Sequence, residues 1–200
     1  MHTLYGDKLS GNCYKIQLLL SHLQTEYQWV DVNILAGESR TDAFLKMSNA
    51  GRIPLLALDS GEYLPESNAI LNYFAQGSSF LPEDALQRAK VLSWQFFEQY
   101  SHEPYIAVAR FIAKYQGMPE SRREEFNAKQ AGGNDALAVM EQHLATQDYF
   151  VGNCITIADF SLYAYTHVAE DGGFSLERYP AIQRWLARIE AHPKHIKMEA

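Results

Sequence analysis

Apolar and polar positions alternate over the first 76 residues in a way that predicts strands and helices in turn. Residues 3–5 and 27–32 are short runs rich in aromatic and β-branched side chains, which are typical of strands. Between these runs, apolar residues recur at the spacing of one helical face, i, i+3, i+4 and i+7: Ile16, Leu19, Leu20 and Leu23. A polar loop at residues 37–41 precedes a second, shorter helix around residues 42–47.

A hairpin and a third helix complete this part of the chain. Two apolar runs, residues 53–58 and 63–64, flank Asp59-Ser60-Gly61, a combination typical of a turn between paired strands. Polar residues 66–68 then open a helix whose apolar side chains are Ile70, Leu71, Tyr73 and Phe74. The order strand-helix-strand-helix-strand-strand-helix predicts one small mixed sheet with helices packed on it.

The rest of the chain shows no strand pattern of comparable strength. Residues 76–83 have the composition of a linker. Helical patterns follow in four regions, of which the first is expected to kink near Pro104 and the second contains Gly132-Gly133: residues 84–116, 120–147, 156–170 and 180–192. The sequence therefore predicts an α/β domain over residues 1–77 and an all-helical domain over residues 84–200.

Composition and charge exclude several classes of protein. The 200 residues are 47% hydrophobic and 20% charged, as in ordinary globular chains, and the net charge of −7 argues against a nucleic-acid or anionic-membrane partner. No run approaches the ~18 apolar residues of a membrane helix, and the N-terminus lacks the pattern of a signal peptide. Two cysteines cannot form a disulfide framework, so we expect a cytoplasmic protein.

Three short segments carry residues suited to binding a charged ligand. The first is SGNCYK, residues 10–15, between the first strand and the first helix. Ser10 and Asn12 are typical capping residues, and capping is the more common role of such residues. A helix start also presents free amides and a positive dipole end, so Ser10 is a candidate donor to a thiolate or a phosphate.

The other two segments lie at the predicted hairpin. Pro54 cannot donate to a strand ladder, and a cis bond before it would leave the backbone of Ile53 to pair with an extended peptide. Taken alone, this pair more simply indicates a proline in an edge strand without a ligand. Glu66 and Ser67 either cap the third helix or receive an α-amino and an α-carboxylate group, the ammonium on Glu66 and the carboxylate on the helix amides.

Together these segments resemble the cytosolic glutathione transferases over essentially the whole chain. The resemblance rests on SGNCYK at residues 10–15, Ile53-Pro54, ESNAI at residues 66–70 and ITIAD at residues 155–159. Members of that family have a thioredoxin-like N-terminal domain, which binds glutathione, and a helical C-terminal domain, which shapes the pocket for the second substrate. The resemblance implies the same α/β plus all-α fold here, and an enzyme with glutathione as its co-substrate.

The resemblance also implies roles for individual residues. The backbone of Ile53, beside a cis Pro54, is expected to pair with the cysteinyl part of glutathione. Glu66 and Ser67 are expected to hold the γ-glutamyl end. Two basic side chains are candidates for the glycine carboxylate: Arg40 and Arg52.

The loop before the first helix is compatible with two subtypes of the family. Ser10 falls where serine-type bacterial, theta and zeta classes place a catalytic hydroxyl. Asn12 falls where the nu-like bacterial group, whose members reduce disulfides, has an asparagine. Beta-class enzymes carry a cysteine at the Ser10 position, and this chain departs from them there. Cys13 does not replace it, because it lies three residues further on.

We therefore expect a glutathione transferase that detoxifies small hydrophobic electrophiles. A thiol with a pKa near 8.5 is only a few per cent ionised at neutral pH, and the thiolate is the nucleophile. Ser10, Asn12 and the dipole of the first helix are expected to favour the anion by about one or two pKa units. The alternatives are a glutathione-dependent disulfide or peroxide reductase and a non-catalytic glutathione-binding stress protein.

Several further residues are expected to have structural roles. TIAD, residues 156–159, is a capping box, so Asp159 is assigned to folding. Cys13 is expected in the core, although a helix start can also favour a mixed disulfide. His192 and His195 fall short of a metal-ligand set, so we expect no metal and interpret them as a helix end and a solvated tail.

The aromatic side chains of the helical region have three expected environments. Most are expected in the core or at a contact between subunits, because family precedent implies a homodimer that packs helices from residues 84–116 across its two-fold axis. A minority is expected to face the electrophile: Tyr105 and Phe111, with Arg110.

Overall fold

The computed structural model describes residues 1–199 and divides into two compact units. The first comprises Met1–Gln76 together with the segment from Lys194 onward, and the second comprises Gly77–Pro193. The first unit contains the sheet and the second is helical, which confirms the predicted fold class. The expected second domain, residues 84–200, had included the C-terminal segment, but that segment packs on the first unit.

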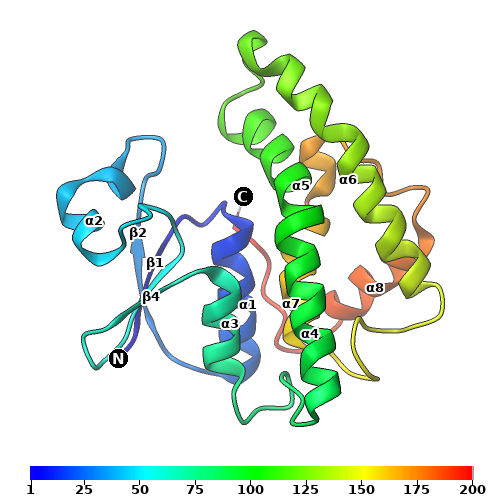
Figure 1. The fold of residues 1–200 in the computed structure, drawn as a ribbon, viewed down its shortest axis with the longest axis horizontal. Coiled ribbons are helices and arrows are strands. Elements are labelled where there is room, and N and C mark those ends of the chain that lie inside the picture. The colour runs from blue at the N-terminus through cyan, green and yellow to red at the C-terminus, as the bar shows by residue number, and fades with distance from the viewer. Residues whose placement is uncertain (200) are drawn as a thin grey trace. The chain divides into compact units, whose positions relative to one another are not determined.

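A small mixed sheet organises the first unit. Strand β1 (Thr3–Gly6) pairs in parallel with β2 (Gln28–Asp31) and antiparallel with β3 (Leu55–Ala57). Strand β4 (Tyr63–Pro65) pairs antiparallel with β3, so the strand order is β2-β1-β3-β4. Figure 1 shows helices on both sides of these strands, a short helix on one side and longer helices on the other. These helices are α2 (Asp42–Met47), α1 (Gly11–Leu23) and α3 (Ser67–Ala75), and the turn Glu38–Arg40 (η1) precedes α2.

The predicted apolar face of α1 is buried. Ile16, Leu19 and Leu20 are fully inaccessible to solvent, as their helical spacing requires, whereas Leu23 at the end of the helix is only partly buried. Helices α1 and α3 pack side by side (Figure 1). On the other side of the sheet, a core cluster joins the sheet to α2, with its members drawn from both: Val32, Phe44 and Leu55, with Tyr5, Met47 and Ile53 packed against them.

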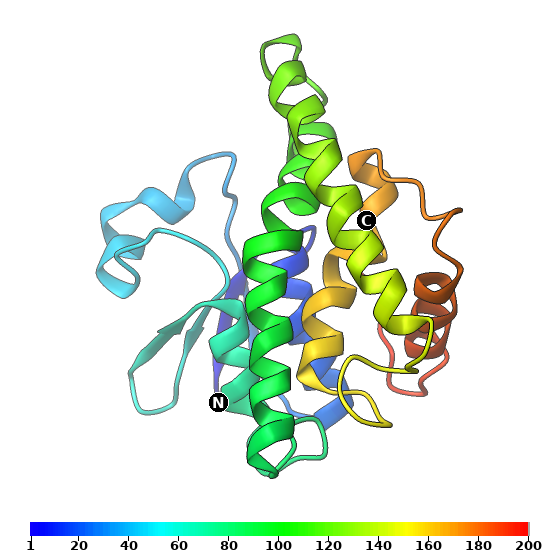
Figure 2. The same ribbon diagram turned by 45° about the vertical axis from the view of Figure 1, so that its right-hand side comes forward.

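The second unit is built from helices only. They are α4 (Ala85–Phe97), α5 (Glu103–Arg110), α6 (Arg123–Leu144), α7 (Ile157–Thr166) and α8 (Pro180–Glu190), with short turns η2 (Glu98–His102), η3 (Phe111–Tyr115), η4 (Glu120–Arg122) and η5 (Ala169–Gly172). Helix α6 runs alongside α5 in Figures 1 and 2. Every residue of α7 is buried, so α7 is the central helix of this unit. Within the described part of the chain, no helix is both long and apolar enough to span a membrane.

Pro104 changes the helical geometry rather than ending the helix. The turn η2, directly before it, is a π-helical turn, and α5 then continues with Pro104 in its first turn. A proline lacks the amide donor and its ring needs room next to the preceding turn, and a wider turn supplies that room. The kink predicted near this residue therefore takes the form of a π turn.

Two consecutive glycines lie in the middle of α6 without interrupting it. A Cβ atom on Gly132 would lie 2.3 Å from the ring of Tyr105, and one on Gly133 would lie 2.2 Å from the ring of Phe174. Glycine lowers helix propensity, but here it permits two aromatic rings to lie against the helix backbone. The weakness expected at these positions is offset by packing.

The capping box at the start of α7 is formed as predicted. Thr156 is the N-cap, and Asp159 bonds back to it. The Asp159 carboxylate accepts hydrogen bonds from the Thr156 amide and hydroxyl, over 2.8 and 3.0 Å, and from the Phe150 amide and Trp185 Nε1, over 3.1 and 3.0 Å. Asp159 therefore joins the helix start to the loop before it and to α8, which is a structural role.

Candidate active site

The Ser10 side chain places a hydroxyl at the start of α1. Ser10 is the N-cap, with φ −78° and ψ 119°, and its Oγ accepts from the Cys13 amide over 3.4 Å. This bond uses a lone pair of the oxygen and not its proton, so the hydroxyl can still donate to a group placed before the helix. The positive end of the helix dipole favours an anion at that place.

The starts of α1 and α3 are joined by a side-chain hydrogen bond. The Ser67 hydroxyl, which is buried, donates to Oδ1 of Asn12 over 3.1 Å. Asn12 lies in the first turn of α1 and Ser67 is the first residue of α3. Two helix N-termini with their free amides therefore lie next to each other, an arrangement that suits a ligand with more than one negative group.

The sheet register brings the Ile53-Pro54 pair to the same edge. The bond between these residues is cis. Leu55, the first residue of β3, lies opposite Tyr5 of β1 and opposite Pro65 of β4, so the cis pair lies at the end of β3 at which β1 leads toward α1 and β4 leads into α3. Within residues 1–199, the Ile53 amide and carbonyl form no backbone hydrogen bond, which leaves both for an extended peptide.

Glu66 has an unusual backbone conformation for a residue with a side chain. Its φ is 72° and its ψ 113°, and it is the exposed residue directly before α3. Such conformations are costly and are found most often where a site requires them. The sequence showed a carboxylate at this place but gave no signal of the backbone geometry that aims it.

The two candidate arginines differ in how they are held. Nη1 of Arg40 donates to the Ala50 carbonyl over 3.1 Å, which ties η1 to the segment before Ile53. Arg52 is exposed and directly precedes the cis bond. Both therefore belong to the first unit, and both flank the segment that carries Ile53.

Tyr105, one of the residues expected at the electrophile pocket, lines a cavity. Tyr105 borders a hollow of about 250 Å³, together with Phe97, Tyr100, Ser101, Gly132, Asp135, Ala136 and Val139. Phe111 packs on Tyr115, with ring centroids 5.1 Å apart. Arg110 is 3% exposed, and its Nε bonds Asp171 Oδ2 over 3.0 Å. Its guanidinium is therefore part of an internal ion pair.

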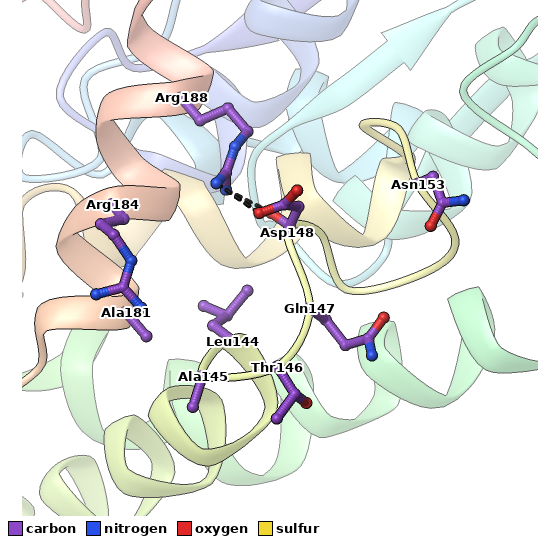
Figure 3. A pocket seen from close by; sticks show the side chains of 9 residues that line it. All are labelled: Leu144, Ala145, Thr146, Gln147, Asp148, Asn153, Ala181, Arg184 and Arg188. Atoms are coloured by element: carbon purple, nitrogen blue, oxygen red, sulfur yellow. Dashed lines mark hydrogen bonds and ion pairs between the residues drawn. The ribbon is translucent and has the colours of Figure 1, made fainter.

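A second cavity of the helical unit, about 290 Å³, contains none of the predicted site residues. Figure 3 shows Arg184 and Arg188 of α8 on one side and Gln147 and Asn153 of the loop after α6 on the other. Arg188 is paired with Asp148 over 2.6 Å. Most of the lining is polar, which does not suit a hydrophobic electrophile.

The buried Cys13 does not compete with the bound thiol for the chemistry. Among residues 1–199, no three His, Cys, Asp or Glu side chains are grouped as metal ligands. Cys13 is fully buried, and burial raises the pKa of its thiol to about 12. A thiol with this pKa is neutral at physiological pH and is a poor nucleophile.

Comparison with known proteins identifies the class. The family models for the N-terminal and C-terminal domains of glutathione S-transferase match residues 2–76 and 94–193. The chain belongs to the glutathione S-transferase family, as its sequence resemblance indicated. The first unit is accordingly the thioredoxin-like domain of that fold.

Individual relatives span nearly the whole chain. A solved glutathione S-transferase from Pseudomonas fluorescens is 55% identical, with a TM-score of 0.97, and the match covers 100% of this chain and 99% of that one. Maleylacetoacetate isomerase of Pseudomonas aeruginosa is 28% identical, over 95% of this chain and 92% of the isomerase. Disulfide-bond oxidoreductase YfcG of Escherichia coli is 25% identical, over 91% of this chain and 87% of the oxidoreductase. The family is therefore established, and these names differ in the reaction they state.

Proposed function

We propose that this family member transfers the glutathione thiolate to small hydrophobic electrophiles, with Ser10 as the donor to the sulfur. The observation that carries the proposal is the place of the Ser10 hydroxyl, whose oxygen caps α1 at the positive end of the helix dipole. A hydroxyl donor at the positive end of a helix favours a thiolate over a thiol.

The rest of the tripeptide follows the edge of the sheet. The backbone of Ile53 pairs with the cysteinyl part, and Glu66 and Ser67 bind the γ-glutamyl end, the ammonium on Glu66 and the carboxylate on the amides of α3. Arg40 and Arg52 bind the glycine carboxylate. The position of Ile53 just before β3, at the end of the sheet where β4 leads into α3, supports this placement.

In this mechanism the protein supplies no general base. Ser10 donates to the sulfur, and the two helix dipoles favour its negative charge, so the thiol loses its proton to water. Each pKa unit requires about 1.4 kcal/mol of preference for the anion, which one charge-assisted hydrogen bond and a helix end can provide. The bound thiolate then attacks an electrophile held nearby, and the orientation of the two reactants accounts for further acceleration.

Glutathione-dependent reduction of disulfides is a second candidate, because Asn12 is held in place at the same helix start by Ser67. In that reaction the glutathione thiolate attacks one sulfur of a disulfide, forms a mixed disulfide and releases a thiolate. The thiolate of a second glutathione then attacks the glutathione sulfur of the mixed disulfide, which forms glutathione disulfide and releases the other substrate sulfur as a thiolate. The Escherichia coli relative is named a disulfide-bond oxidoreductase, which is a reason to assay disulfide reduction alongside conjugation.

Replacement of Ser10 by alanine and by threonine tests the proposal. We expect Ser10→Ala to raise the pKa of bound glutathione by about one unit and to lower conjugation of an aryl halide about tenfold or more, while Ser10→Thr, which keeps a hydroxyl, retains most activity. An alanine variant with unchanged thiol pKa and unchanged rate would refute the role of Ser10. Loss of disulfide reduction alone in Asn12→Ala would favour the second candidate, and absence of glutathione binding in calorimetry would indicate a non-catalytic protein.

The electrophile pocket and the subunit contact are also proposals. Tyr105 and Phe111 are the aromatic candidates for the pocket. The exposed apolar face of α4 and η2, with Leu92 42%, Phe96 62% and Tyr100 81% exposed, supports a homodimer that covers it. Phe96→Glu is expected to shift the mass measured by light scattering from dimer to monomer.

A further inference from the structure

The last residues of the chain lie along the helix that carries the candidate site. We use "C-terminal strap" for residues 194–199; the sequence suggested a helix end and a solvated tail at residues 192–195, which overlap its start. At the end of α1, the Lys194 carbonyl accepts from Ser21 Oγ over 2.8 Å, and Lys194 Nζ donates to the His22 carbonyl over 3.1 Å and to Gln24 Oε1 over 2.9 Å. An ammonium group at a helix C-terminus satisfies end carbonyls and complements the helix dipole.

The strap then runs toward the other end of the same helix. The buried Tyr14 hydroxyl, one turn into α1, donates to the Ile196 carbonyl over 2.6 Å. Beyond it, Glu199 Oε2 lies 2.8 Å from Lys8 Nζ, in the loop between β1 and α1. This hydrogen bond, together with the charge of Glu199, holds the pKa of Lys8 above its ordinary value.

These contacts surround Ser10 on both sides. Lys8 lies two residues before Ser10 and Tyr14 four residues after it, and each is bonded to the strap. In Figure 1 the C-terminal segment, in red, lies beside the blue helix α1. The contacts occur in reverse order along α1, so the strap is antiparallel to the helix and restrains both of its ends.

Such a restraint matters because the backbone of Ser10 is bonded to Asp7 and Tyr14 over 3.0 and 2.8 Å, whereas its side chain is held less firmly. Its bond to the Cys13 amide is long, at 3.4 Å. A hydrogen bond to an anion loses strength steeply as its length and angle depart from the optimum, so a small displacement of the loop changes how well Ser10 stabilises a thiolate.

We propose that the C-terminal strap is a positioning element of the glutathione site, which holds the loop and first turn of α1 so that the Ser10 hydroxyl points at the sulfur. This inference rests on the proposed role of Ser10. It makes Tyr14 and Glu199 positioning residues, and neither touches the ligand. Residues 194–199 would therefore affect how well Ser10, at the start of α1, stabilises the bound thiolate.

Two single substitutions in the full-length protein test the strap. Tyr14→Phe removes only the hydroxyl that bonds Ile196, and Tyr163→Phe is its matched control, because buried Tyr163 loses an equivalent bond to Glu190 in the other unit. Glu199→Gln breaks the pair with Lys8, and Glu120→Gln, which breaks the exposed pair with Arg123, is its control. For each variant we would measure the pKa of bound glutathione from its thiolate absorbance, the glutathione dissociation constant, kcat/KM and the melting temperature.

We expect Tyr14→Phe and Glu199→Gln each to raise the pKa of the bound thiol by about half a unit and to lower kcat/KM at neutral pH about threefold, with the dissociation constant little changed. Both controls should retain the wild-type thiol pKa. The direction in Glu199→Gln is decisive, because freeing the Lys8 cation would by charge alone lower the thiol pKa.

The outcomes separate this inference from the proposed function. A wild-type protein that leaves the glutathione thiol at its free-solution pKa overturns both. A wild-type protein that lowers this pKa, with Tyr14→Phe and Glu199→Gln indistinguishable from their controls or shifted downward, overturns the strap alone. A lower melting temperature with an unchanged pKa of the bound thiol would also overturn the proposal, because the strap would then only stabilise the fold.

Discussion

The hydroxyl of Ser67 donates to the side-chain oxygen of Asn12 over 3.1 Å, so the first turns of α1 and α3 are connected directly. Asn12 is fifty-five residues from Ser67 in the chain. In the proposed site Asn12 lies at the thiol end of glutathione and Ser67 at the γ-glutamyl end. The bond therefore links the two parts of the ligand site.

This link predicts that the two residues are energetically coupled. Asn12→Ala and Ser67→Ala should each weaken glutathione binding and lower the unfolding free energy, and the double variant should lose less than the sum, with a coupling of about 0.5–1.5 kcal/mol. Urea denaturation and calorimetry measure both quantities. Ser60→Ala, which removes an exposed hairpin hydroxyl bonded to Glu62, should be additive with Asn12→Ala. If the effects of Asn12→Ala and Ser67→Ala were also additive, the proposed coupling between these residues would be contradicted.

The two cysteines should differ sharply in reactivity. Cys13 is buried with a thiol pKa of about 12, whereas Cys154 is exposed. At pH 8 the buried Cys13 thiol stays neutral and shielded, so an aromatic disulfide reagent should titrate one thiol per native chain and two after denaturation. Cys154→Ser should abolish the fast reaction in the native protein. A fast reaction that survived this substitution would show that Cys13 is accessible.

Gly132 should be intolerant of a side chain despite its position in a helix. Alanine would raise helix propensity by about 1 kcal/mol, but its Cβ would lie 2.3 Å from the Tyr105 ring. We expect overpacking to prevail, with Gly132→Ala lowering the unfolding free energy by about 1–3 kcal/mol. The same substitution in a Tyr105→Ala background should cost little or should stabilise, because the ring is gone. Equal effects in both backgrounds would rule out the clash as the cause.

Asp159 should make stability depend on pH in an unusual direction. Burial raises the pKa of its carboxyl from 3.8 to about 6, in spite of hydrogen bonds from Thr156, Phe150 and Trp185. The folded state then binds a proton that the unfolded state has released, so this group's contribution to the unfolding free energy falls as pH rises from about 4 to about 6. A shift of about two units corresponds to on the order of 3 kcal/mol.

Asp159→Asn isolates this contribution, since asparagine does not titrate. The stability advantage of the wild type over the variant, measured by urea denaturation, should be larger at pH 4.5 than at pH 7.5. The variant should be less stable than the wild type at both pH values. The NH₂ of the introduced asparagine would face N–H donors of the backbone and of the Trp185 indole, and it cannot accept hydrogen bonds from them. An advantage that was the same at both values would mean that the carboxyl is ionised throughout this range.

Local sequence signals determined most of the architecture. Helical spacing of apolar residues predicted α1 and α8, and the capping box predicted the start of α7, because these signals depend on neighbours within one or two turns. The family motif predicted the cis bond before Pro54. The candidate residues Ser10, Asn12, Ile53, Glu66 and Ser67 were likewise visible, as residue types at helix starts and beside a proline.

Tertiary structure decided what these signals could not. The bond between Ser67 and Asn12, the left-handed backbone of Glu66 and the contact of Tyr105 with Gly132 all depend on which distant segments meet, and spacing along the chain carries no information about that. The C-terminal strap is the largest difference from expectation. Its polar composition is typical of a solvated tail, yet the carbonyls of Lys194 and Ile196 bond α1, because backbone groups pair wherever the fold brings donors to them.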